Sequence, residues 1–434
     1  MKTLRTTCCV VGGGPAGVML GYLLARAGIK VTVLEKHEDF FRDFRGDTVH
    51  PSTLDIMHQL GLLDGLLQLP HQRVTSVSAR IGNLDFAAAD FRLVPSRCKF
   101  VALMPQWDFL NFLSERAKRF ASFELRMRHE GTGLFRDGGR IAGVEAQSPD
   151  GPLQIAADLV VACDGRHSTI RQSARLSVQE FGVPIDVLWF RISRQPHDPE
   201  QVLGNINYGK ALILINRGNY FQAGLIIRKG TFEQIKAKGL DALRQNIAQI
   251  APYLRDRVAE IEDWDQLKLL TVQVNRLRRW HLPGLLCIGD AAHAMSPAGG
   301  VGINLAIQDA VAAANILTGP LRAGRVTDLI LKQVQRRREF PTRVTQFLQV
   351  NAHKALNAAF QTDGPIQVPW QLKVVDALPG RKWIMGYVVG VGVRPEHVVD
   401  AETIRIPQSL QKLAVRFGAS IGAIMKTARF LRAC

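Results

Sequence analysis

The sequence is poor in cysteine and has no long uninterrupted apolar run. Its six cysteines are Cys8, Cys9, Cys98, Cys163, Cys287 and Cys434. They form no CxxC pair and no Cys/His cluster with the spacing of a metal site. Most lie in apolar runs, where a thiol behaves as a small buried hydrophobe. These absences predict a reduced protein without metal.

A membrane-spanning helix is not expected, because no window reaches about 18 uninterrupted apolar residues. Lys2 and Arg5 precede an apolar stretch that resembles a secretory signal peptide. The glycine cluster from Gly12 to Gly17 suits a turn better than an apolar helix. The expected location is therefore the cytoplasm.

Acidic residues are scarce relative to basic ones. The chain has 38 Asp and Glu residues and 55 Lys and Arg residues, which gives a formal net charge of +17. This surplus favours anionic partners such as phosphates, carboxylates, nucleic acid or a membrane surface. The chain has no zinc finger, RNP-like stretch or long basic run, so nucleic acid is not expected as a partner.

A glycine-rich turn lies between two short apolar stretches near the N-terminus. Gly12-x-Gly14-x-x-Gly17 follows a predicted strand and opens a predicted helix, and the next strand ends at Glu35. Glu35 lies 23 residues after Gly12. This distance is close to the spacing of about 20 residues at which an acid binds ribose hydroxyls. The pattern predicts a dinucleotide-binding βαβ unit whose helix N-terminus holds a pyrophosphate. It leaves FAD and NAD open.

Two further motifs follow buried strands. The first is Asp164-Gly165, and the second is Gly289-Asp290, which precedes a glycine-rich loop over residues 296–304. Asp290 stands at the carboxyl end of its predicted strand, where doubly wound sheets bind ligands, and can accept hydrogen bonds from a ribitol-like chain. The N–H groups of the loop suit the anion that develops on a reduced flavin. This motif therefore favours FAD over NAD.

In this order and spacing, the three motifs resemble those of the class A FAD-dependent monooxygenases, the aromatic hydroxylases typified by p-hydroxybenzoate hydroxylase and phenol hydroxylase. The resemblance covers residues 5–345. It implies that the first motif binds the ADP half of FAD, the Asp-Gly motif serves FAD and NAD(P)H, and the Gly-Asp motif holds the ribitol. Many relatives have Pro-Pro and a glutamine between glycines in the last loop, where this chain has Ser296-Pro297 and Gly300-Val301-Gly302. Flavin movement and substrate choice stay open.

The motifs and the resemblance together define the expected cofactor site. Its residues are Gly12, Gly14, Pro15, Ala16, Gly17, Glu35, Lys36, Arg45, Gln106, Asp164, Gly165, Gly289, Asp290, Pro297, Gly300, Val301, Gly302, Ile303 and Asn304. Arg45 resembles an arginine near the pyrophosphate and Gln106 a flavin-contacting glutamine. For both, a solvated polar residue is the alternative.

The resemblance implies an enzyme that hydroxylates a small aromatic or polycyclic substrate through a flavin C4a-hydroperoxide. It would use FAD as cofactor, NADH or NADPH as transient reductant and O₂ as co-substrate. Because the cofactor carries this chemistry, no catalytic triad is expected. His50, His293 and Pro297 are the catalytic candidates, with a structural role as the alternative for both histidines. Another flavin reductase, dehydrogenase or oxidase and a non-catalytic redox sensor stay open.

The expected fold class is α/β, with an interrupted Rossmann-like FAD-binding domain of mostly parallel sheet. It comprises residues 1–73, 99–180 and 284–345; an antiparallel-sheet substrate domain comprises 74–98 and 181–283, and a mostly helical region comprises 346–434. The substrate domain is expected to contain a helix near residues 233–259.

Two polar features bear on ligands and partners. Trp189 and Arg191 fall on one predicted strand and point the same way, so they can hold an anionic aromatic ligand, with ordinary packing as the alternative. The basic tail over residues 403–434 is expected to dock on the body rather than on a membrane surface. A homodimer is left open.

Overall fold

The computed structural model describes residues 2–41, 48–199, 203–361, 364–368 and 370–399. Residues 1–397 form one compact unit, and a second unit begins at residue 398. The predicted cofactor residue Arg45 and the basic tail over residues 403–434 lie outside the described residues.

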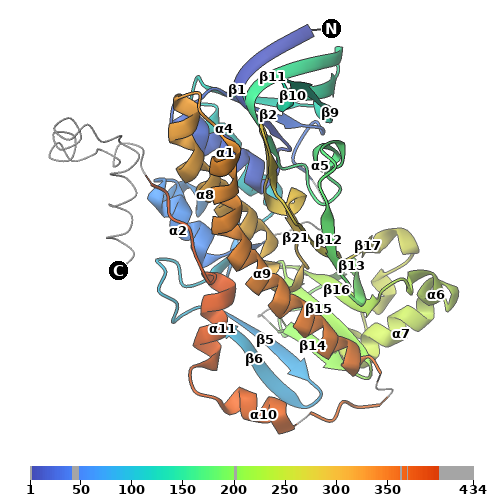
Figure 1. The fold of residues 1–434 in the computed structure, drawn as a ribbon. Helices are drawn as coiled ribbons and strands as arrows, with labels where there is room; N and C mark the ends of the chain where they lie inside the picture. The colour runs from blue at the N-terminus through green and yellow to red at the C-terminus, as the bar shows by residue number, and fades with distance from the viewer. Residues whose placement is uncertain (1, 42–47, 200–202, 362–363, 369, 400–434) are drawn as a thin grey trace. The chain divides into compact units, whose positions relative to one another are not determined.

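An eight-stranded sheet is built around the N-terminal strand (Figure 1). In spatial order its main path is β19 (His281–Leu282), β20 (Leu285–Cys287), β11 (Gly151–Ala162), β1 (Lys2–Val11), β2 (Val31–Glu35) and β8 (Phe123–Met127). The strands from β20 to β8 are mutually parallel, and their apolar sequences follow from burial on both faces.

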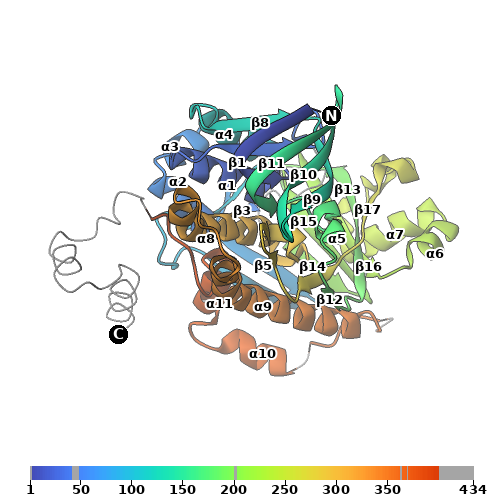
Figure 2. The same ribbon diagram turned by 45° about the horizontal axis from the view of Figure 1, so that its top comes forward.

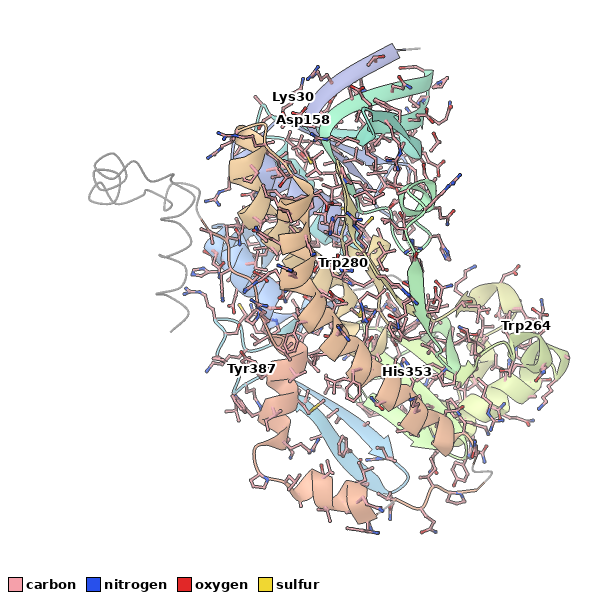
Figure 3. The ribbon with its side chains drawn as sticks, in the orientation of Figure 1. Lys30, Asp158, Trp264, Trp280, His353 and Tyr387 are labelled. Carbon is pink, nitrogen blue, oxygen red and sulfur yellow. The ribbon has the colours of Figure 1, made fainter. Side chains whose placement is uncertain are left out.

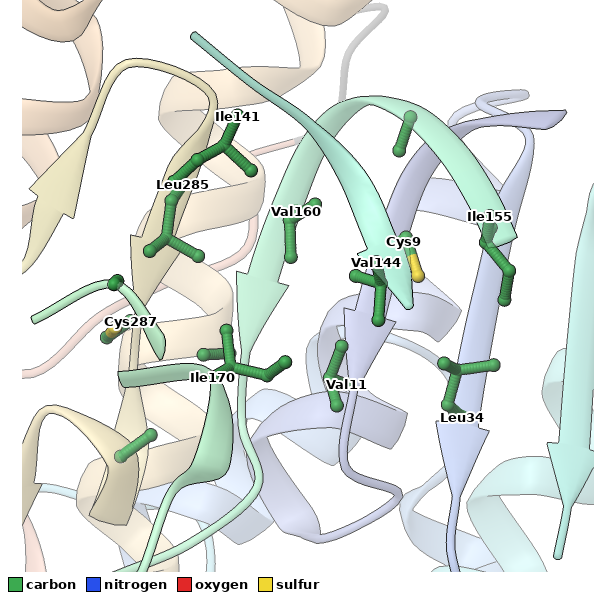
Figure 4. Packing of buried hydrophobic residues seen from close by; sticks show 14 of the residues in the cluster. Cys9, Val11, Leu34, Ile141, Val144, Ile155, Val160, Ile170, Leu285 and Cys287 are labelled. Carbon is green, nitrogen blue, oxygen red and sulfur yellow. The ribbon is translucent and has the colours of Figure 1, made fainter. Parts of the chain in front are cut away.

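Different elements cover the two faces of this sheet. On one face, Cys9 and Val11 pack with Val144 of β10 (Arg140–Ser148), as Figure 4 shows. β10 pairs with β11 and with β9 (Glu130–Asp137). The helices α1 (Pro15–Arg26), α4 (Gln106–Ala117) and α8 (Gly302–Arg322) pack together, and α1 brings Gly21 against Val33 on the opposite face.

A second, seven-stranded sheet is antiparallel except for one pair. Its order is β17 (Lys268–Leu270), β13 (Ile185–Ser193), β16 (Tyr220–Arg228), β15 (Lys210–Asn216), β14 (Leu203–Asn207), β5 (Ser76–Ile81) and β6 (Leu84–Asp90), with β14 and β5 parallel. A mixed α/β fold with a parallel and an antiparallel sheet is therefore confirmed.

The predicted single helix near residues 233–259 is wrong. Gly239, at φ +85°, separates α6 (Phe232–Ala237) from α7 (Leu240–Ile250), because its left-handed backbone cannot continue a helix. α7 covers one face of the seven-stranded sheet, where Leu243 and Ile247 pack with Phe190.

The C-terminal part of the compact unit contains three helices: α9 (Asp328–Ala359), α10 (Trp370–Ala377) and α11 (Arg381–Gly390). α9 runs beside α8 in both views (Figures 1 and 2). It is continuous across residues 345 and 346, so the structure has no break at that predicted boundary. The apolar stretch Ala298–Arg322 is long enough to cross a membrane, but 67% of its most apolar window is buried, as in a core helix.

The remaining α-helices and strands of the described residues are short. They are α2 (Pro51–Gln59), α3 (Leu63–Leu66), α5 (Thr169–Ser173), β3 (Thr48–Val49), β4 (Gln72–Val74), β7 (Val101–Leu103), β12 (Val178–Phe181), β18 (Val274–Leu277) and β21 (His293–Ala294).

Candidate functional site

The three glycine motifs meet at the carboxyl ends of neighbouring parallel strands. Gly12 follows β1, Asp164 follows β11, and Gly289 follows β20. The Cys163 N–H donates to Val11 O over 2.7 Å. This edge is where open parallel sheets bind ligands, so adjacent strands bring together motifs that are distant in sequence.

Two glycines of the first motif are required by close packing. Gly12 has φ +107°, and a Cβ there would lie 2.4 Å from Cys163 O. A Cβ at Gly17 would lie 1.9 Å from Gly12 O. Both positions exclude side chains because backbone atoms already occupy the space.

Gly14 differs, because a Cβ there would meet no atom within 4 Å. It is the N-cap of α1 and supplies no side-chain hydrogen bond to the first turn, which begins with Pro15 and Ala16. The turn thus combines open space with the N–H groups and positive dipole end of a twelve-residue helix. These features fit a pyrophosphate.

Glu35 ties the end of β2 to this turn. Its Oε2 accepts the Gly13 N–H and its Oε1 accepts the His37 N–H, each over 3.0 Å. The carboxylate therefore stands beside the glycine turn, where it can also accept ribose hydroxyls. The neighbouring Lys36 is exposed, with Nζ 3.9 Å from Glu130 Oε1.

Asp164 carries an unpaired buried acceptor. Its Oδ2 accepts the Ile170 N–H over 3.1 Å, while its Oδ1 is buried with no hydrogen-bond partner among the described residues. Burial raises the pKa of this carboxyl. The adjacent Gly165 has φ +86°, and a Cβ there would meet no atom within 4 Å. Since an unpaired buried oxygen is costly, Asp164 fits a site completed by a ligand donor.

The second and third motifs are joined by two arginines. Arg166 Nη2 lies 3.7 Å from Asp290 Oδ2, and both side chains are about one-third exposed. The buried Arg171 donates to Ala291 O over 3.1 Å and to Arg166 O over 2.7 Å. The sequence-based site omitted Arg171, although its position shortly after the Asp-Gly turn was a usable signal. The partly exposed Asp290 carboxylate can still accept hydrogen bonds from a polyol.

A buried carboxylate supports the Gly-Asp turn from behind. Asp309 Oδ2 accepts the Gly289 N–H over 3.0 Å and lies 2.6 Å from His293 Nε2, while its Oδ1 accepts Arg338 Nε–H over 2.9 Å. Burial alone would raise the pKa of Asp309, but His293 and Arg338 hold it below its usual value. His293 also packs against Trp280, with ring centroids 5.0 Å apart. Its contacts are those of a supporting residue.

The loop after Gly-Asp is held by α9. Ser296 N–H donates to Gln349 Oε1 over 3.1 Å, and Gln349 Nε2–H donates to Ser296 O and Ala298 O. His353 of α9, labelled in Figure 3, also contacts Ser296. Pro297 is exposed. No sequence motif indicated that α9 would fix this loop.

Gly300 and Asn304 complete the loop. Gly300 has φ +61°, and a Cβ there would lie 2.2 Å from Thr48 Oγ1. Asn304 Oδ1 accepts the His50 N–H and the Thr53 hydroxyl, while its Nδ2–H donates to Thr48 O and Gly300 O. Asn304 therefore fixes the loop to β3 and the start of α2.

His50 connects this region to α11. Its Nδ1–H donates to Val389 O over 2.8 Å, and burial lowers the pKa of the imidazole to about 4. The ring is therefore neutral near pH 7, and one nitrogen is already engaged. Val301 packs with Met295, Leu305 and Val389, so the loop has an apolar wall.

The other predicted residues occupy separate places. Gln106 is the half-buried first residue of α4, Gly302 opens α8, and Ile303 follows it half-buried. Trp189 is buried in a cluster with Phe360, and its Nε1 has no hydrogen-bond partner among the described residues. Arg191 is exposed, with its guanidinium 5.3 Å from the Tyr220 ring centroid.

Comparisons with known proteins agree on one family. Residues 5–348 match the family described as "FAD binding domain". The chain is 30% identical over 348 residues to 6-methylpretetramide 4-monooxygenase of Streptomyces rimosus, covering 80% of this chain and 83% of that protein. It is 28% identical to rifampicin monooxygenase of Streptomyces venezuelae, covering 69% of this chain but only 61% of that protein. The anhydrotetracycline hydroxylase OxyS from Streptomyces rimosus has the same fold, with TM-score 0.72, 21% identity and coverage of 91% and 77%.

Proposed function

The chain belongs to the FAD-binding family of flavin-dependent aromatic monooxygenases, and from this premise we propose that it hydroxylates a polycyclic aromatic substrate with NAD(P)H and O₂. FAD, when bound, supplies the redox and oxygen-transfer chemistry. One observation carries the proposal: three separate motifs meet at one sheet edge beside an apolar-walled loop. The protein's task is to bind, orient and exclude water.

Different residues at the strand ends would bind different parts of FAD. We assign the pyrophosphate to the open space at Gly14 and the N-terminus of α1, and the adenosine ribose to Glu35. The exposed Asp290 oxygen would hold the ribitol, and the unpaired Asp164 Oδ1 would accept a further donor of the cofactor. The space at Gly14 and the Asp164 Oδ1 have no partner among the described residues, and Glu35 would accept ribose hydroxyls in addition to its two backbone donors.

The loop over residues 296–304 would lie against the redox-active ring. Hydrogen bonds from Gln349 and Asn304 fix its backbone, so its glycine N–H groups need little reorganisation when negative charge develops. Met295, Val301 and Val389 offer apolar surface beside it. Such surface suits a fused-ring substrate, and the two monooxygenase relatives are named for 6-methylpretetramide and for rifampicin.

The seven-stranded sheet would form the far wall of the substrate site. This assigns residues 74–98 and 181–283 to substrate binding, inserted between the parts of the FAD-binding domain. Trp189 packs with Phe360, and the Arg191 guanidinium lies over the Tyr220 ring. Because both side chains are engaged in this way, we place the surface that contacts the substrate ring nearer to α11 than to Trp189 and Arg191. His50, neutral and bonded to Val389 O, would hold α11 in position rather than transfer a proton.

A substrate screen tests the proposal. The purified protein is incubated with polycyclic phenols, and NADH or NADPH oxidation is measured with and without each compound. A hydroxylase gives substrate-stimulated oxidation and a product heavier by one oxygen atom that derives from ¹⁸O₂. Stimulated oxidation without labelled product would identify a reductase or oxidase, and FAD without any stimulated turnover would favour a redox sensor.

A further inference from the structure

Helix α11 packs with its glycine side inward. A Cβ at Gly386 would lie 2.0 Å from Asp90 O, and one at Gly390 would lie 2.9 Å from the Phe91 ring. Ile384 projects from the other side of the helix and is 51% exposed. Trp383, seven residues before Gly390, lies on the glycine side, where its Nε1–H donates to Leu93 O over 3.1 Å, and the residue is 41% exposed.

Helix α10, which precedes it, also presents apolar side chains to solvent. None of its residues is buried. Trp370 and Val374 are one helical turn apart on α10, Leu378 follows directly after its last residue, and each of the three is more than half exposed. Figures 1 and 2 show α10 directly before α11, at the end of the compact unit away from β1.

These side chains define one exposed surface, which we call the α10–α11 patch: Trp370, Val374, Val375, Leu378, Trp383 and Ile384. Scattered exposed apolar residues are ordinary, but here six of them, including two tryptophans, fall within the fifteen residues from 370 to 384, which indicates an interaction surface. The charges within the patch decide which partner fits.

The exposed charges of the two helices are basic. Lys373 and Lys382 are both exposed. Asp376 is paired with Arg381, whose Nη2 lies 2.6 Å from its Oδ1. Arg381 is buried, with its guanidinium 4.1 Å from the Phe86 ring centroid. The acidic charge is therefore neutralised locally, while the two lysines are left to attract an anionic partner.

Two other candidate occupants of the patch, both from this protein itself, carry the wrong charge. A second copy of the chain would bring a further +17. The C-terminal segment over residues 403–434 contains six basic residues and no acid. Both would place positive charge beside Lys373 and Lys382, which disfavours contact.

We propose that the α10–α11 patch binds the surface of an anionic lipid bilayer. Tryptophan is favoured at the headgroup level because its ring is apolar while its N–H is polar. Lysines beside an apolar helix face complete the pattern of a helix that lies on a membrane, with electrostatic attraction adding to apolar burial.

The patch is directly linked to the candidate site. The inner side of α11 carries Val389, whose carbonyl accepts His50 Nδ1–H and whose side chain packs with Val301 and Met295. One helix thus contacts the loop over residues 296–304 on its inner side and lipid on its outer side. This step rests on the proposed function. A polycyclic substrate dissolved in the bilayer would enter the candidate site beside α11.

Vesicle co-sedimentation of the full-length, FAD-loaded chain tests the proposal without using turnover. The vesicles are phosphatidylcholine with or without phosphatidylglycerol. We expect the wild type to pellet only with the anionic vesicles and to be released by salt. The double variant W370S/W383S should bind at least about tenfold more weakly, because the two largest apolar side chains of the patch are lost. K373E/K382E should also lose binding.

A matched control removes an exposed apolar residue outside the patch. Leu329 on α9 is 72% exposed, so L329S should pellet like the wild type. All variants are compared by circular dichroism and FAD content, so that unfolding is not read as lost binding. Equal binding of the wild type to neutral vesicles, or wild-type binding by W370S/W383S, would overturn the proposal.

The competing occupants give different results. Loss of binding in R429E/R432E, with retention in W370S/W383S, would assign the membrane contact to the C-terminal segment. A wild-type dimer that W370S/W383S converts to a monomer in sedimentation velocity would assign the patch to a second copy. Either result overturns the proposal. Vesicle binding without hydroxylase activity would instead contradict only the proposed function.

Discussion

Ser296 Oγ lies 2.9 Å from His353 Nε2, and both residues are buried. The same Oγ accepts the Ala298 N–H over 3.1 Å, so its own proton is available for the histidine. Burial lowers the pKa of His353, which keeps the imidazole neutral and able to accept that proton. Ser296 thus fixes the loop over residues 296–304 to α9.

Replacing Ser296 with alanine should destabilise the protein by about 1–3 kcal/mol, because His353 Nε2 and the Ala298 N–H lose their partner in a buried place. Urea unfolding measures the change in free energy. Ser177→Ala, at an exposed serine, is the control and should change it by less than about 0.5 kcal/mol. Equal stability of the two variants would show that the Ser296–His353 contact contributes nothing.

Gly14→Val should leave the protein folded but remove most of its FAD. The new side chain meets no protein atom within 4 Å and instead fills the space assigned to the pyrophosphate. The absorbance of released FAD per protein measures retention. Gly319→Ala is also in open space, in α8, and should retain FAD fully. Full FAD occupancy of Gly14→Val would refute the assignment of this turn.

Asp290→Ala should weaken FAD binding by about ten- to a hundredfold, since a hydrogen bond to a charged group is worth about 1.5–3 kcal/mol. Fluorescence titration of the apoprotein gives the affinity. Asp290→Asn keeps one acceptor and should lose less. Asp85→Ala removes an exposed carboxylate that pairs with Arg80, and should have no effect. An unchanged affinity in Asp290→Ala would mean that this carboxylate does not contact the cofactor.

Stability should fall as the pH drops from about 6.5 to about 4. The folded pKa of His50 is about 4, below the value of about 6.5 expected in the unfolded chain, so the unfolded state binds more protons across this range. The loss from His50 is roughly 3 kcal/mol. His50→Asn keeps a donor for Val389 O without titrating, so its unfolding free energy should depend less on pH. An identical pH profile would contradict the burial of a neutral imidazole.

Arg338→Met should cost about 3–5 kcal/mol of stability. Arg338 is fully buried between Asp309 and Glu396, with Nη1 3.2 Å from Glu396 Oε1, and its removal leaves two buried carboxylates without their shared cation. Urea unfolding again supplies the measurement. Arg336→Met, on the exposed side of the same helix, is the control and should be nearly neutral. Similar effects of both variants would exclude this ion network as a source of stability.

The sequence by itself determined the βαβ unit, the mixed α/β class and the family. Glycine spacing, strand-like apolar runs and Glu35 are local signals whose meaning depends on neighbours in sequence. The interrupted helix near residue 239 was missed, because a single glycine is tolerated in many helices and only its left-handed backbone shows the break.

Only the tertiary structure decided what supports the site. Arg171, Arg338, Gln349 and His353 carry no motif, and each gains its role by reaching across the fold to backbone or carboxylate groups of another segment. The exposed face of α10 and α11 was likewise invisible in sequence. An apolar helix is normally expected to turn its bulky side chains inward, and here close packing of Gly386 and Gly390 against β6 and Phe91 turns Ile384 outward.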